Sequence, residues 1–93
     1  MAFKLNFYTL NVGMSSTLAG LPSIVKSENL DVLFLQEVCL SANQIRNLLR
    51  GYDASVNYDE NNLSTPGTAL VWREGFQFQK FAPLFLAELK LHL

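Results

Sequence analysis

The 93-residue sequence has little charge, a single cysteine and no long apolar run. Charged residues make up 16% of the chain, against roughly a quarter in average soluble domains. No basic cluster is present, so charge alone indicates no nucleic-acid surface. Cys39 has no partner for an internal disulfide, which favours a reducing intracellular location, nuclear or cytoplasmic. Neither a membrane-spanning segment nor a signal-peptide pattern is visible, so no membrane contact is expected.

The sequence is rich in apolar residues, which make up 49% of the chain, and aromatic residues make up 12%. This composition, with a net charge of only −1, excludes intrinsic disorder. The length suits one domain. A short chain with so many apolar and so few charged residues would expose apolar surface to water. This indicates either that a partner binds the apolar surface or that the chain is not the whole of its fold.

The N-terminal residues predict a strand followed by a helix. Apolar and polar residues alternate over residues 3–9, which is typical of a strand, and Asn11 falls at its C-terminal end. Apolar residues then recur at helical spacing over residues 18–25. Because proline is tolerated only in the first turn of a helix, Pro22 predicts that this helix begins near Leu21.

A second strand and a second helix follow. Residues 30–35 form a nearly continuous apolar run, typical of a parallel strand covered on both faces by helices, which Glu37 and the glutamine before it interrupt. Ser41 and Gln44 have the spacing of a capping box, and Gly51 predicts the end of that helix.

The rest of the chain predicts several strands. Alternation over residues 52–58 indicates a half-exposed strand, and a polar loop follows. Residues 68–73 and 76–80 indicate two strands joined by a hairpin turn, and residues 81–93 favour a further strand over a helix. We therefore expect an α/β fold, an α+β layered sandwich that begins as a βαβ unit and continues with mostly antiparallel strands.

The predicted topology brings two polar side chains together. Strands of a βαβ unit are parallel, so Asn11 and Glu37 end neighbouring strands at the same sheet edge, where such folds place their ligand sites. A carboxylate that follows an apolar strand is costly to leave desolvated, and magnesium, which prefers oxygen ligands, would stabilise it. The alternative is that Glu37 reaches solvent or pairs with a nearby lysine or arginine.

Three motifs resemble the endonuclease/exonuclease/phosphatase superfamily. They are residues 9–12 (Thr-Leu-Asn-Val), residues 31–37 (Asp-Val-Leu-Phe-Leu-Gln-Glu) and residues 67–73 (Gly-Thr-Ala-Leu-Val-Trp-Arg). The chain is most similar to the endonuclease domain of LINE-type, non-LTR retrotransposons. The resemblance implies that Glu37 binds magnesium or manganese, that Asn11 helps to hold the metal and the scissile phosphate, and that both serve catalysis. It also implies DNA as the partner of the complete domain.

Other motifs of that family are missing. Asp59-Glu60-Asn61 has the form of its Asp-x-Asn motif but comes too early, and His92, the only histidine, lacks the preceding Ser-Asp. The resemblance therefore implies that residues 1–93 are the N-terminal portion of a single domain, inactive alone. Two alternatives stay open: a phosphoesterase of the same superfamily acting on an inositol polyphosphate, sphingomyelin or a poly(A) tail, and a non-catalytic interaction module.

Two residues near these motifs have simpler interpretations. Cys39 lacks a histidine motif nearby, so we expect a small apolar filler, not a nucleophile. Trp72 is expected to pack in or beside a hairpin.

Overall fold

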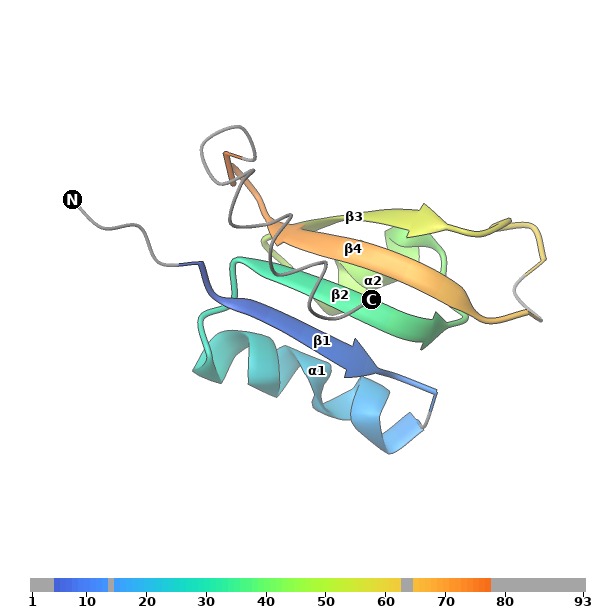
Figure 1. Cartoon of the computed structure of the whole chain (residues 1–93), viewed down its shortest axis with the longest axis horizontal. Coiled ribbons are helices and arrows are strands. Elements are labelled where there is room, and N and C mark those ends of the chain that lie inside the picture. Colours follow the sequence, from blue (N-terminus) through green and yellow to red (C-terminus); the bar gives the residue numbers. More distant parts are fainter. Residues whose placement is uncertain (1–4, 14, 63–64, 78–93) are drawn as a thin grey trace.

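The computed structural model describes residues 5–13, 15–62 and 65–77 (Figure 1). These residues form four strands and two helices. In chain order the elements are β1 (Phe7–Asn11), α1 (Ser15–Ser27), β2 (Val32–Val38), α2 (Ala42–Leu48), β3 (Tyr52–Asn57) and β4 (Gly67–Arg73).

The four strands form one mixed sheet in the order β1-β2-β4-β3. β1 is parallel to β2, and α1 connects them, so the chain begins as a βαβ unit. β4 pairs antiparallel with both β2 and β3. This arrangement confirms the predicted α/β class, with a parallel start followed by antiparallel strands.

One face of the sheet packs against both helices and forms the core. Leu33 and Leu35 of β2 and Val71 of β4 are completely buried there, together with Leu21 of α1 and Ile45 of α2. The alternation predicted for residues 52–58 is observed in β3, whose core-facing side chains are buried or half-buried.

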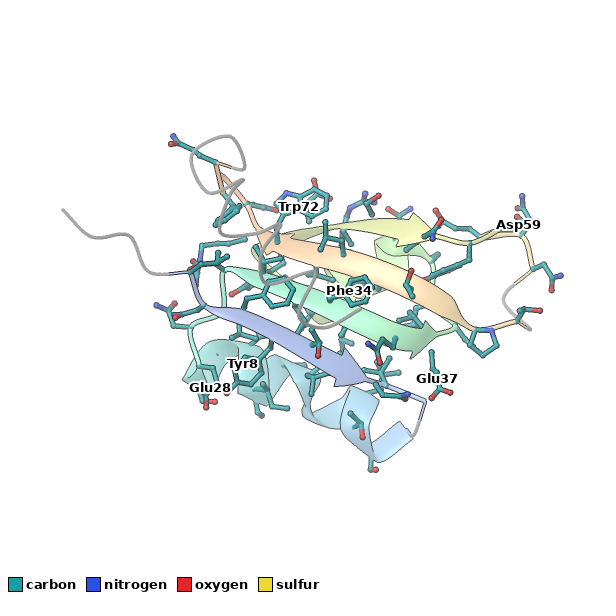
Figure 2. All side chains as sticks on the ribbon, in the orientation of Figure 1. Tyr8, Glu28, Phe34, Glu37, Asp59 and Trp72 are labelled. Carbon is teal, nitrogen blue, oxygen red and sulfur yellow. The ribbon has the colours of Figure 1, made fainter. Side chains whose placement is uncertain are left out.

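The opposite face of the sheet is apolar as well. Val32, Phe34, Leu70 and Trp72 lie on it in register, since Val32 pairs with Trp72 and Phe34 with Leu70. Figure 2 shows Phe34 and Trp72 on the side of the sheet turned towards the reader, away from α2. Both described helices therefore contribute to one face, which differs from the expected strand with helices on both faces.

α1 begins earlier than Pro22 predicts. The helix starts at Ser15 and carries Pro22 in its interior, on the exposed side. A proline inside a helix costs about 3 kcal/mol, but burying each of Leu21 and Val25 stabilises the helix by about 1.5–3 kcal/mol. The buried stripe outweighs the lost hydrogen bond, so the expected start at Leu21 is wrong.

The second helix begins as the sequence predicts but ends at Leu48, with Leu49 as its C-cap, before the predicted end at Gly51. The Ser41 hydroxyl accepts from the Gln44 N–H at 3.1 Å, and the Ser41 N–H donates to the Gln44 side chain at 2.8 Å. After the helix, Gly51 has a φ of 87°, in the left-handed region that favours glycine. Neither described helix is of the length and apolarity that a bilayer crossing requires.

The described chain ends just after β4. Glu74 and Gly75 form the predicted turn, in which the Phe76 N–H donates to the Arg73 carbonyl at 2.9 Å. Phe76 and Gln77 are not part of a strand. The remainder of the strand predicted over residues 76–80, and the strand predicted over residues 81–93 with His92, lie outside the described residues.

Candidate metal centre

The carboxyl ends of β1 and β2 meet at one edge of the sheet. Asn11, the last residue of β1, pairs with Gln36, and the Val12 N–H donates to the Gln36 carbonyl at 2.9 Å. Glu37 follows directly and lies at the same end, beside the segment that leads from β1 into α1 (Figure 2). The prediction that the topology brings Asn11 and Glu37 to one sheet edge is confirmed.

A β-bulge determines where the Glu37 side chain points. Leu35 pairs with Ala69 and Val38 with Gly67, so β2 holds one extra residue between these pairs. Regular alternation would aim Glu37 into the core beside Leu35. Instead Val38 occupies the core, 1% exposed, and Glu37 is exposed with a φ of 57°. The strand thus continues to Val38, past the predicted interruption.

The backbone conformation of Glu37 is strained. A left-handed conformation costs a residue other than glycine about 1–2 kcal/mol. Strained residues of this kind persist where the surrounding structure fixes them, and they cluster at functional sites. At Glu37 the strain accompanies the bulge that turns a carboxylate out of the core.

Gly13 keeps a space free between the two side chains. A Cβ atom at this position would lie 2.5 Å from Glu37 Oε2 and 3.2 Å from Asn11 Oδ1. Both oxygens therefore face the same small volume, and any larger residue would displace the carboxylate. Asn11 is held in place because its Oδ1 accepts from the Gly13 N–H at 3.0 Å.

The two oxygens are of the type that a hard divalent cation prefers. Magnesium is usually bound through one or two carboxylates and keeps several waters, so Glu37 Oε2 and Asn11 Oδ1 suit it as a partial ligand set. Within the described residues, Glu37 forms neither a salt bridge nor a hydrogen bond. The alternative of an ion pair with lysine or arginine is thus not observed there, whereas solvent does reach the carboxylate.

A cavity of about 210 Å³ adjoins the carboxylate. It lies between the turn after β1, the first half of α1 and the end of β2, and Glu37 and Cys39 contribute to its wall together with Leu18. Cys39 is exposed at this cavity, so the expectation of a small apolar filler is wrong. The bulge explains the difference, since it moves Val38 into the core and leaves the residues on either side exposed.

Tyr58 and Gly67 hold the chain on the other side of the bulge. The Tyr58 hydroxyl donates to the Leu40 carbonyl, just beyond β2. Its ring lies so close to Gly67 that a Cβ there would come within 2.2 Å of it. Burial raises the pKa of Tyr58, with a smaller contribution from Glu60, so the phenol stays protonated and able to donate.

The early Asp-x-Asn sequence has a structural role. Asp59 Oδ1 accepts from the Asn61 N–H at 2.9 Å, which closes a turn, and Glu60 Oε2 accepts from the Ala42 N–H at 3.0 Å. Glu60 thus caps the first turn of α2, where a negative charge is favourable. No group of three or more histidine, cysteine or acidic side chains gathers anywhere in residues 5–13, 15–62 and 65–77.

The sequence matches a known protein family over most of its length. The profile of the Endonuclease/Exonuclease/phosphatase family matches residues 8–89. The chain belongs to the endonuclease/exonuclease/phosphatase family. Members of this family are generally hydrolases that act on phosphoester bonds. Neither the curated proteins nor the solved structures include a significant match.

Two glycines of this family member support the site without contributing a ligand. The signal for Gly13 in the sequence is its position two residues after Asn11. Gly67 belongs to the Gly-Thr-Ala motif, but only the position of the Tyr58 ring explains why a glycine is needed there. Glycine has no side chain, so a role as a spacer is not visible in a pattern of apolar and polar residues. Neither role was therefore predicted from the sequence.

Proposed function

We propose that Glu37 and Asn11 bind a divalent metal, magnesium or manganese, as part of a site that hydrolyses phosphodiester bonds in DNA. The observation that carries this proposal is the Glu37 carboxylate, which has no partner among the described residues, is turned out of the core by a bulge and faces Asn11 Oδ1 across Gly13. Family membership supports phosphoester hydrolysis in general.

Each residue has a separate task in this proposal. Glu37 supplies the negative charge that binds the cation, and Asn11 supplies a neutral oxygen and an amide N–H₂ that suits a phosphate oxygen. Gly13 leaves the space that both need. When bound, the metal would polarise a phosphoryl oxygen and stabilise the leaving group.

The family resemblance requires a Ser-Asp pair before the catalytic histidine, and Lys90-Leu91 stand there before His92, the only histidine of the sequence. His92 itself lies outside the described residues. We therefore propose that residues 1–93 contribute the N-terminal portion of a single domain and do not cleave DNA alone. Removing one member of a catalytic set costs orders of magnitude in rate, since the members act as a unit.

The retrotransposon branch of the family is our preferred assignment. It rests on the resemblance of the Gly67-Thr68-Ala69 motif to the endonucleases of LINE-type elements. The Tyr58 ring lies against Gly67 and leaves no room for a side chain there. This contact explains why the motif begins with glycine.

Metal binding tests the proposal without any need for activity. In a ¹⁵N–¹H spectrum, Mn²⁺ should broaden the amide signals of Asn11, Gly13 and Glu37 first, and Glu37→Gln should weaken this effect by about tenfold or more. Glu28→Gln is the matched control, because Glu28 is an exposed glutamate away from this sheet edge. Broadening that is unchanged in Glu37→Gln, or centred elsewhere, would contradict the assignment.

A nicking assay on supercoiled plasmid with Mg²⁺ tests the second part. We expect no cleavage by the 93-residue chain. Cleavage that disappears in Glu37→Gln but persists in Glu28→Gln would overturn the proposed inactivity while supporting the role of Glu37.

A further inference from the structure

A second and larger cavity lies at the opposite end of the sheet. Its volume is about 360 Å³, within the range of small-molecule sites. Both helices return from the carboxyl ends of the strands, so the last turns of α1 and α2 border this cavity, together with the end of β4. Its apolar wall consists of Pro22, Val25, Leu48 and Leu49.

The fold gathers positive charge around this apolar wall. Lys26, Arg50 and Arg73 all line the cavity, although they are widely separated in the sequence. They are three of the four lysines and arginines among residues 5–13, 15–62 and 65–77, and no aspartate or glutamate lines the cavity.

Two of these cations have no partner in the described part of the chain. The side chains of Lys26 and Arg50 form no hydrogen bond or salt bridge there, whereas that of Arg46, the fourth cation, donates to Asp53 at 2.7 Å. Arg73 is partly engaged: its Nε lies 3.4 Å from Asp31, and its Nη2 donates to Asn29 at 2.7 Å. Its guanidinium also lies 5.5 Å from the centre of the Tyr52 ring.

Tyr52 adds an aromatic wall but no negative charge. Burial raises the pKa of Tyr52, which Arg73 partly opposes, so the phenol is neutral at ordinary pH. The Tyr52 hydroxyl donates to the Leu30 carbonyl, which fixes the ring beside the cavity.

The helix ends explain part of this charge distribution but do not cancel it. Cations are favoured at helix C-termini, each of which carries about half a negative charge in a long helix. Two such ends and the Asp31 carboxylate together offset about two of the three positive charges. Because α2 has only seven residues, its contribution is smaller still. Glu28 and Glu74 adjoin lining residues in the sequence but do not line the cavity, so the positive charge is concentrated on the cavity wall itself.

We propose that this cavity binds a small organic anion, a carboxylate or phosphate group on an apolar or aromatic body. The body would pack against Val25, Leu49 and the Tyr52 ring, and the anionic group would contact the charges of Lys26 and Arg50, which have no partner among the described residues. The site is separate from the Asn11–Glu37 edge and does not depend on the metal proposed there.

Amide shifts in a ¹⁵N–¹H spectrum of the 93-residue chain test this proposal, with benzylphosphonate as the probe and EDTA present. We expect saturable shifts at Val25, Leu49 and Arg50. Benzyl alcohol, which lacks the anion, and inorganic phosphate, which lacks the apolar body, should each bind more weakly by about tenfold. Raising the salt concentration should weaken benzylphosphonate binding.

Charge substitutions locate the binding site. Arg50→Gln and Lys26→Gln should each weaken binding by about three- to fivefold, the value of one ion pair between exposed groups. Arg46→Gln is the matched control, because Arg46 is on the same helix as the cavity-lining Leu48 but outside the cavity. The spectrum of each variant without ligand reports whether it is folded.

Three outcomes would overturn the proposal. They are the absence of saturable shifts in the unsubstituted chain, equal binding of benzyl alcohol, and shifts centred on Glu37 instead of the cavity. Equal affinity of the Arg50→Gln, Lys26→Gln and Arg46→Gln variants would also refute recognition by these two charges.

Discussion

The two ends of the sheet present opposite chemistry. At the carboxyl ends of β1 and β2, a bulge and a glycine set two oxygen-bearing side chains against one small space, and no cation pairs with Glu37 in the described residues. At the other end, Arg73 joins Asp31, Asn29 and the Leu30 carbonyl, and two further cations surround a cavity.

The two ends also differ in what stabilises them. Steric fit fixes the Glu37 end: Gly67 has no room for a side chain beside Tyr58, a side chain at Gly13 would displace the Glu37 carboxylate, and Glu37 itself is strained. Hydrogen bonds and charges, partly open to solvent, fix the Arg73 end. We therefore expect substitutions at the first end to act through steric fit and those at the second to act through charge and salt.

The largest effect is expected at Gly67. A Cβ there would come within 2.2 to 2.8 Å of three Tyr58 atoms near the base of that side chain, which cannot simply swing away. Gly67→Ala should lower the free energy of unfolding by about 2–3 kcal/mol, as overpacking does. Gly20→Ala, the matched control, places its Cβ in open space inside α1 and should stabilise by about 0.5–1 kcal/mol.

Urea unfolding followed by circular dichroism measures both variants. Equal stability of Gly67→Ala and Gly20→Ala would mean that Tyr58 does not constrain this end of the sheet, and the contrast between the two ends would be lost.

An intermediate effect is expected at Asp31, at the opposite end. Its carboxylate accepts from the Asn6 N–H at 3.1 Å and faces Arg73 Nε at 3.4 Å, and its side chain is 24% exposed. Asp31→Ala should cost about 1–2 kcal/mol, since charged hydrogen bonds are strong but solvent screens part of this pair. Asp53→Ala should cost less, because the Arg46–Asp53 pair is more exposed.

The salt dependence of the loss of stability distinguishes an effect of charge from an effect of steric fit. The loss caused by Asp31→Ala should shrink in high salt, whereas the loss caused by Gly67→Ala should not change. A salt-independent loss at Asp31 would show that this end, too, depends on shape.

The smallest effect is expected at Glu37, and it is a gain. Glu37→Gly relieves the positive φ of 57° and should stabilise the fold by about 0.5–1 kcal/mol, after the entropic cost of glycine. Glu37→Gln keeps the strain and should leave thermal stability unchanged. A loss in Glu37→Gly would mean that the carboxylate stabilises the fold, which argues against a role reserved for ligand binding.

The sequence predicted much of the fold because its signals are local. The strand endings at Asn11 and Arg73, the capping box of α2 and the turn at Gly51 each follow from a pattern within a few residues. α1 shows the limit: Pro22 is a strong local signal, yet burial of Leu21 and Val25 against the distant sheet decides the outcome.

The candidate site was only half predictable for the same reason. Topology brings Asn11 and Glu37 together, but the direction of the Glu37 side chain depends on an extra residue relative to β4, which no local pattern shows. The larger cavity, at the other end of the sheet, could be predicted even less from the sequence. Lys26, Arg50 and Arg73 form no cluster in the sequence and meet only because two helices and a strand end at the same place.

The bulge in β2 also bears on the order in which the chain acquires its site during synthesis. Residues up to Val38 contain the whole β1–α1–β2 unit, but the extra residue exists only relative to β4, whose Gly67 pairs with Val38. Until Gly67 has left the ribosome, the pairing that defines the bulge at Glu37 cannot form, and such long-range pairing is among the slower steps of folding. The carboxylate is therefore positioned late, although it is translated early.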